Sequence, residues 1–254
     1  MYSKLPFDSL SVNTPHSFSE RVNRLTERDY KIGTSGRLVP KSPQGGRAIP
    51  WIFINQDARK KFCAFWNHVC TTHFNLIPTN CRMNCWKTVI KPRNVLELFE
   101  VYETMVALDL PSKVGMDMRN YTYGAWAGFV YADTLEEGRE YYNRLKDAVK
   151  PKRVPIILKR GCTEMERLVS SDKWGTISEK DLELERRLCD LFEFSEPYFA
   201  QAAWLKVEIR ERWIRRAIEI GDPTAREAAE KYSEDPDIWE KLVVESVTYH
   251  DKKE

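Results

Sequence analysis

The hydrophobic pattern between residues 85 and 160 switches repeatedly between strand and helix spacing, and this switching constrains the fold more than any other feature of the chain. Strand patterns cover residues 86–91, 112–119, 125–131 and 154–158, and helix patterns cover 94–108 and the segment between Thr134 and Pro151. Asn94, and either Asp133 or Thr134, provide the side chains that favour helix starts. We therefore predict the order strand, helix, strand, strand, helix, strand.

This order is the split βαβ, or ferredoxin-like, arrangement, which belongs to the α+β class. It is expected to place the first and third strands centrally in an antiparallel sheet, the second and fourth at its edges, and both helices on one face. The composition of the strands fits this arrangement. Residues 125–131 are almost all apolar, as a central strand requires, whereas Pro155 is better tolerated at an edge.

The other segments define the predicted domain organisation. Residues 1–50 are predicted to form a basic arm or long loop with one short helix near Ser19–Asp29, because glycine and proline recur after it. Residues 51–170 would hold the sheet domain, opened by a helix over 55–74 and by a loop over 76–85. Residues 171–254 are predicted as a four-helix extension. Its helices would begin near Ser178, Ser195 (with Pro197), Asp222 (with Pro223) and Asp235 (with Pro236).

Charge is unevenly distributed along the chain. Residues 1–94 contain 15 Lys and Arg against 5 Asp and Glu, and the remainder contains 25 against 33. A basic first part predicts an anionic partner, of which nucleic acid is the commonest. An electrostatic match between the two parts of the chain would give the same numbers.

Alternation along the strands predicts a second, polar face of the sheet. If the helices cover Val114, Met116 and Met118, the opposite face receives basic residues together with the aromatic rings of the third strand, either Phe129 and Tyr131 or Trp126. The residues predicted to bind nucleic acid are Lys87, Lys91, Lys113, Arg119, Phe129, Tyr131, Lys159 and Arg160. RNA-recognition modules use such a face, with rings stacked on bases and cations on phosphates. The aromatic motif of those modules is not matched here, because Tyr131 follows Gly128-Phe129-Val130 one position too early.

Six cysteines in a chain of this length suggest thiols or metal ligands. Cys81 and Cys85 are separated by three residues, a spacing found in zinc sites, and Cys63, His68 and Cys70 lie just upstream. The hypothesis is a structural zinc site built from Cys81, Cys85, Cys162 and Cys70. The alternative is that the cysteines are buried as small apolar side chains.

The segment after the last strand offers a candidate catalytic site. Glu164 and Glu166 follow Lys159 and Arg160, and together with Asp117 they could hold a divalent metal for phosphodiester chemistry. Opposite edge positions of the two strands would separate these carboxylates by roughly 14 Å. In the alternative, Glu164 and Glu166 pair with the neighbouring basic residues.

The sequence lacks the motifs of several function classes. These are phosphate-binding glycine loops, dinucleotide-binding folds, serine hydrolases and zinc proteases. No apolar run reaches the length of a membrane span, so we expect a cytoplasmic protein without a membrane partner. The first hypothesis is a nucleic-acid-binding protein. The others are a metal-dependent nuclease and a scaffold or inhibitor whose C-terminal helices bind a protein partner.

Overall fold

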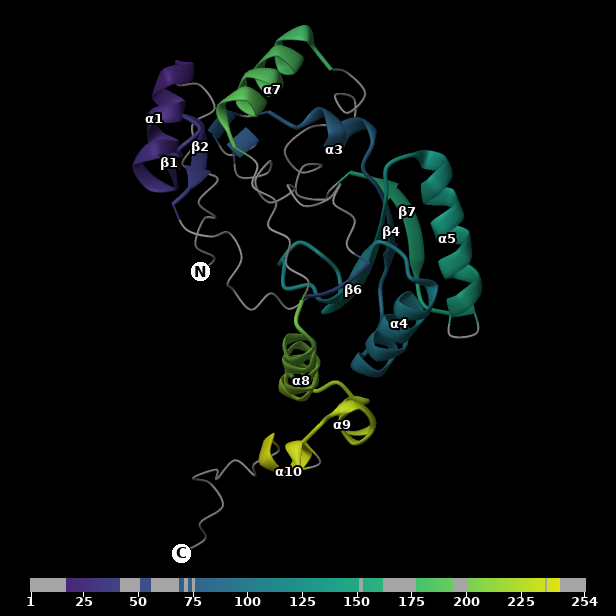
Figure 1. The fold of residues 1–254 in the computed structure, drawn as a ribbon. Coiled ribbons are helices and arrows are strands. Elements are labelled where there is room, and N and C mark those ends of the chain that lie inside the picture. Colours follow the sequence, from purple (N-terminus) through teal and green to yellow (C-terminus); the bar gives the residue numbers. More distant parts are fainter. Residues whose placement is uncertain are drawn as a thin grey trace, which may run out of the picture. The chain divides into compact units, whose positions relative to one another are not determined.

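The computed structural model describes residues 17–41, 51–55, 69–70, 73–74, 76–150, 153–161, 177–193, 201–235 and 237–242. The chain forms two compact units, each assembled from separate stretches of sequence. Unit 1 comprises residues 1–46, 58–84 and 161–198, and unit 2 comprises 47–57, 85–160 and 199–254. Both units contain helices and strands (Figure 1).

Unit 2 is built on a five-stranded, fully antiparallel sheet. Its strands are β3 (Trp51–Ile54), β4 (Trp86–Ile90), β5 (Ser112–Met116), β6 (Trp126–Ala132) and β7 (Ile156–Arg160). They lie in the order β3-β5-β6-β4-β7. The apolar strand β6 is central and β7, which follows Pro155, is at an edge, and both positions were predicted.

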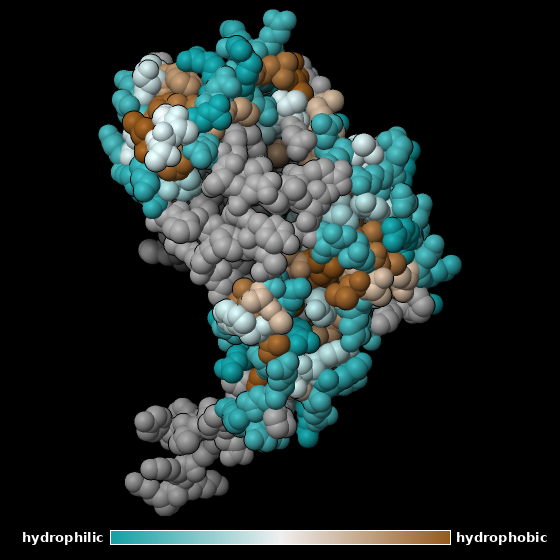
Figure 2. All heavy atoms as spheres, viewed as in Figure 1, coloured by the Kyte–Doolittle hydropathy of each residue, from teal (hydrophilic) through white to brown (hydrophobic). Residues whose placement is uncertain are grey.

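Two helices cover one face of this sheet, α4 (Val95–Leu108) and α5 (Leu135–Val149). Asn94 and Thr134 cap them by accepting hydrogen bonds from the backbone N–H groups of Glu97 and Glu137, as the sequence predicts. The outer surface of α5 is largely hydrophilic (Figure 2), and its buried side bears Leu145 and Val149. The helices therefore pack through one apolar side, which faces the core of unit 2.

The strand β3 was not predicted, and it changes the position of β5. Residues 51–54 pair with 115–112, so β5 lies inside the sheet and not at its edge. The outer side of β3 is hydrogen bonded by a side chain: Gln201 Nε2 donates to the Trp51 carbonyl at 2.7 Å, and the Phe53 N–H donates to Gln201 Oε1 at 2.8 Å. The Gln201 side-chain amide thus provides hydrogen bonds that a further strand would otherwise make to β3.

The strand β5 is shorter than predicted. It ends at Met116, and the chain then leaves the sheet, so Met118 is 72% exposed and does not belong to the helix-covered face. Val114 and Met116 do lie on that face and are buried. The alternating pattern continues to residue 119, beyond the end of the strand. Alternation does not show where the pairing with the neighbouring strand ends.

Three helices complete unit 2, namely α8 (Ala203–Glu219), α9 (Ala225–Tyr232) and α10 (Ile238–Leu242). Trp213 of α8 is fully buried, and Tyr232 of α9 stacks on Phe99 of α4 at 4.2 Å between ring centroids. The predicted start of α8 at Ser195 is wrong, because Gln201 and Ala202 are not helical and Gln201 is held on β3. The predicted starts of α9 and α10 lie within a few residues of the observed ones.

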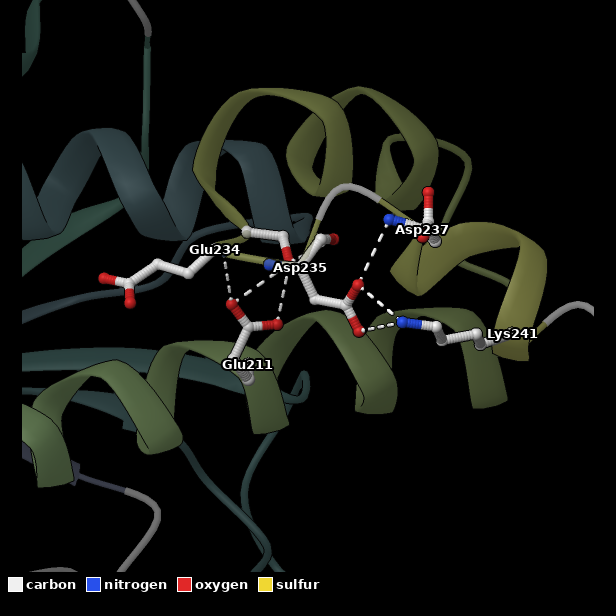
Figure 3. A network of polar contacts seen from close by, with 6 residues as sticks. Glu211, Glu234, Asp235, Asp237 and Lys241 are labelled. Atoms are coloured by element: carbon white, nitrogen blue, oxygen red, sulfur yellow. Dashed lines mark hydrogen bonds and ion pairs between the residues drawn. The ribbon is translucent and has the colours of Figure 1, made fainter.

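A polar network fixes the turn between α9 and α10 to α8 (Figure 3). The Glu211 carboxylate of α8 accepts hydrogen bonds from Ser233 Oγ at 2.9 Å and from the Glu234 N–H at 2.8 Å. Asp235 then accepts from the Asp237 N–H and from Lys241 Nζ. On α8 itself, Arg212 pairs with Glu208 and Arg216 pairs with Glu219. These pairs between neighbouring turns are typical of a solvated helix face.

Unit 1 is formed by smaller elements: α1 (Phe18–Arg28), β1 (Tyr30–Ile32), β2 (Leu38–Pro40), α3 (Thr79–Met83) and α7 (Glu179–Leu191). The starts of α1 and α7 agree with the sequence, and Ser17 and Ser178 both form capping boxes. Leu25, Tyr30, Leu188 and Phe192 pack in one apolar cluster. The helix α7 belongs to unit 1 and α8–α10 belong to unit 2, so the helices of the predicted extension are divided between the two units.

Two predicted loops contain regular structure in unit 1. Residues 30–40 of the predicted arm form an antiparallel hairpin. Its turn contains Gly33 and Gly36, and Gly36 has a φ of +79°. Residues 79–83 of the predicted cysteine loop form α3, which Glu185 of α7 holds by accepting hydrogen bonds from Thr79 N and Oγ1. The predicted helix over 55–74 lies largely outside the described residues.

Candidate cation and aromatic site on the sheet

The second face of the unit 2 sheet brings together most of the residues predicted to bind nucleic acid. Residues opposite one another in register share a face. One row contains Lys159, Lys87 and Tyr131, and the next contains Ile157, Val89, Phe129, Lys113 and Phe53. Of the two alternatives for the third strand, Phe129 and Tyr131 lie on this face, and Trp126 lies in the helix-covered core.

Basic side chains on this face contact the aromatic rings. Lys113 Nζ lies 4.6 Å from the ring centroid of Trp51 and 5.4 Å from that of Phe129. Lys87 Nζ lies 5.4 Å from the Tyr131 centroid. These distances are within the range of cation–π interactions, which orient each cation over a ring.

Arg119 extends this set from the loop after β5. Its guanidinium carbon lies 5.8 Å from the Phe129 centroid and 5.7 Å from that of Tyr121. Neither Tyr121 nor Trp51 was predicted as a site residue. The signal for Trp51 was the run Trp-Ile-Phe-Ile between Pro50 and Asn55, which is typical of a short buried strand.

Asp117 is the buried centre of an ion-pair cluster. Its side chain is fully buried, and it accepts hydrogen bonds from Arg119 Nε at 2.7 Å, Arg119 Nη2 at 2.8 Å and Lys91 Nζ at 3.1 Å. Burial by itself would raise the pKa of Asp117, but the hydrogen bonds and charges of Arg119 and Lys91 outweigh it and lower the pKa to about 2. The carboxylate is therefore ionised at neutral pH and fixes the positions of two cations.

This arrangement bears on the predicted nuclease site. Both oxygens of Asp117 accept hydrogen bonds from cations, which is the pattern of a structural ion pair. Glu164, Glu166 and Cys162 lie outside the described residues. The grouping of Glu164 and Glu166 with Asp117 therefore stays a prediction.

Burial separates the centre of this face from its margin. Phe129 and Lys87 are each 8% exposed and Val89 is buried, so little of the Phe129 ring is available for stacking on a base. Lys91, Lys113, Arg119, Tyr131 and Lys159 are half-buried. These half-buried side chains thus form a margin of cations and rings around a buried centre. This arrangement differs from the open aromatic platform of an RNA-recognition module.

Arg160 lies on the other face of the sheet. It pairs in register with Trp86, and its guanidinium carbon lies 6.0 Å from the Trp86 centroid. Alternation along β7 places it opposite to Lys159. Arg160 is therefore not part of the same surface as the other predicted residues.

Of the described cysteines, Cys70, Cys81 and Cys85 are buried and Cys189 is half-buried. Cys70 and Cys81 belong to unit 1 and Cys85 to unit 2. Burial, with smaller contributions from the Glu185, Cys189 and Cys81 charges, strongly raises the pKa of the Cys70 thiol, so it is protonated at neutral pH. The described part of the chain contains no group of three or more His, Cys, Asp or Glu side chains placed to hold a metal ion.

Comparison of the chain with protein-family models, curated proteins and solved structures finds no match. Among the described helices, none has both the length and the apolar character that crossing a bilayer requires.

Proposed function

We propose that this protein binds nucleic acid through the cation and aromatic margin of the unit 2 sheet. The observation that carries the proposal is the placement of Lys113 and Arg119 over the rings of Trp51, Tyr121 and Phe129. Cations next to flat rings suit a ligand that alternates phosphates with bases, because the cations attract phosphates and the half-buried rings of Trp51 and Tyr121 can stack on bases.

We further propose that β4 to β7, with α4 and α5, form a ferredoxin-like core to which β3 is added. The strand order β5-β6-β4-β7 and the two helices on one face support this assignment. In such a core the face opposite to the helices is available for ligands. That is the face on which the cation–π contacts lie.

The local charge supports an anionic ligand. In the Lys91, Asp117 and Arg119 cluster two cations share one carboxylate, which leaves one net positive charge, and Lys113 adds a second. Because Asp117 holds the cations in fixed positions, binding a phosphate would cost little side-chain entropy. The excess of basic residues over residues 1–94 acts in the same direction.

The test is the salt dependence of binding to a labelled oligonucleotide, measured by fluorescence anisotropy. The wild-type protein should bind at low salt and weaken as salt rises. Lys113→Gln and Lys159→Gln should each lower the slope of log Kd against log salt by about 1, because each removes a phosphate contact. Arg226→Gln is the matched control, since Arg226 lies on α9 in a surface ion pair with Glu230 and its loss should leave the slope unchanged.

Two outcomes would contradict this proposal. The first is no binding of the wild-type protein to any oligonucleotide at low salt. The second is an equal change of slope in Arg226→Gln and Lys113→Gln, which would indicate binding to overall charge.

The nuclease, the zinc site, the protein partner of the C-terminal helices and the cytoplasmic location stay predictions, because nothing in the described residues favours them.

A further inference from the structure

The loop between β5 and β6, residues 117–125, is a closed turn at the edge of the proposed site. The Asp117 N–H donates to the Ala125 carbonyl at 2.7 Å, and Thr122 N and Oγ1 both donate to the Arg119 carbonyl. Gly124 has a φ of +75°, a conformation that side-chain-bearing residues rarely adopt. These bonds give the loop a defined shape.

This loop exposes two large side chains. Tyr123 is 92% exposed and Met118 is 72% exposed. A tyrosine ring exposed to this degree gains no apolar burial within the chain, so its ring face is available to a ligand. Tyr123 has the highest exposed fraction among the exposed large apolar side chains that the structure describes.

The loop also holds a cation at its base. Arg119 is anchored to the buried Asp117 carboxylate by two hydrogen bonds, and its guanidinium packs over Tyr121. Between Arg119 and Tyr123 the chain makes one tight turn, closed by Thr122. A fixed cation and an exposed ring therefore lie within five consecutive residues of one loop.

We infer that this loop selects single-stranded over double-stranded nucleic acid by stacking an unpaired base on Tyr123. The inference rests on the proposed function and names the substrate class of the same site. In a duplex the base faces are covered by their neighbours, so an exposed ring gains contact only with a base outside a stack. Arg119 holds the adjoining phosphate, which either form of nucleic acid offers.

The experiment uses the full chain and one labelled DNA strand of about 12 nucleotides, a length within the span of known single-strand sites. Binding is measured by anisotropy for the strand alone and for its duplex at the same salt. The wild-type protein should bind the single strand more tightly. Tyr123→Ala should weaken single-strand binding about tenfold and leave duplex binding unchanged, because one stacked base is lost.

Two further variants separate stacking from other effects. Tyr123→Phe keeps the ring and should bind the single strand as the wild-type protein does. Trp204→Ala removes another exposed aromatic ring, 69% exposed on α8, and should change neither affinity. Because Tyr123 lies almost wholly in solvent, Tyr123→Ala should fold normally, which circular dichroism checks.

The outcomes distinguish this inference from the function on which it rests. Salt-dependent binding that Tyr123→Ala leaves unchanged, or weakens equally for strand and duplex, overturns the stacking role but retains the binding function. Tighter wild-type binding to the duplex also overturns it. Failure of the wild-type protein to bind either form removes both proposals.

Discussion

On one face of the five-stranded sheet Ile90, Val114 and Val130 lie against α4 and α5, whereas on the other face Val89 and Lys113 occupy adjacent positions of the same strands. The first face belongs to a large apolar core that also includes Trp126 and Trp213. The second has a small apolar cluster of Val89, Ala127 and Phe129, bordered by cations.

The difference shows how one alternating pattern separates the residues that stabilise the fold from the residues of the proposed binding site. On the helix-covered face, Ile90, Val114 and Val130 are almost completely removed from water and contribute apolar burial. The cations at the margin of the other face keep part of their exposure, so they can still reach a ligand. Substitutions on the two faces should therefore affect different measurements.

The largest effect on stability is expected from Trp126→Ala. Trp126 is 1% exposed in the main core, and removing its ring should lower the free energy of unfolding by about 3–5 kcal/mol. Phe129→Ala, three residues further along β6 and on the other face, should cost less, about 3 kcal/mol, because its cluster is smaller. Urea denaturation measures both values.

Oligonucleotide binding should rank these two variants in the opposite order, with the larger loss of affinity in Phe129→Ala. Phe129→Ala removes a ring on which Lys113 and Arg119 pack, so it should weaken binding under conditions where the protein is folded. Trp126→Ala should bind as the wild-type protein does. Equal losses of affinity in both variants would show that the two faces are not functionally distinct.

The next effect is the contribution of Asp117 to the free energy of unfolding, which depends on pH. Its pKa is lowered from 3.8 to about 2 in the folded chain, so its ionisation stabilises the fold by about 2 kcal/mol at neutral pH. This contribution is complete above the unfolded pKa, that is above about pH 4, and is lost as pH falls through about 2. Asp117→Asn lacks it at every pH.

The measurement is the free energy of unfolding of the wild-type and Asp117→Asn proteins between neutral and acid pH. The difference between them should be largest near pH 7 and shrink towards zero below about pH 2. A difference that does not change with pH would mean that the ion pairs of Asp117 with Lys91 and Arg119 do not stabilise the fold.

Locally determined features of this fold could be predicted from the sequence. Asn94, Thr134 and Ser178 cap helices where the sequence indicates, because the hydrogen bonds of a cap join residues three positions apart. Alternation also assigned Lys87, Lys113 and Lys159 correctly to one face. The same rule failed for Met118, since the end of β5 depends on where its partners end.

The features that were missed depend on residues far apart in the sequence. The hydrogen bonds that hold β3 and α3 involve Gln201 and Glu185, each about a hundred residues or more from the backbone that it contacts. Likewise, the sequence predicted Asp117 as a catalytic carboxylate, and only the structure shows that Lys91 and Arg119 both bind its side chain. Tyr123 is exposed because its loop leaves the sheet, which periodicity does not indicate.

The smallest of these effects is expected at β3, the strand that contributes to both faces. Ile52 and Ile54 enter the main core, and Trp51 lies on the other face beside Lys113. Gln201→Ala would remove two hydrogen bonds from the outer side of β3, at a cost of about 1–2 kcal/mol.

Amide hydrogen exchange locates this effect. In Gln201→Ala the Phe53 N–H loses its acceptor and should exchange faster, whereas the Val89 N–H in β4 lies between two paired strands and should be unaffected. Because Trp51 would also be held less firmly, oligonucleotide binding should weaken slightly while the helix-covered core stays intact. Faster exchange throughout β4 and β6 would instead show that β3 supports the whole sheet, and the two faces could then not be perturbed separately through this strand.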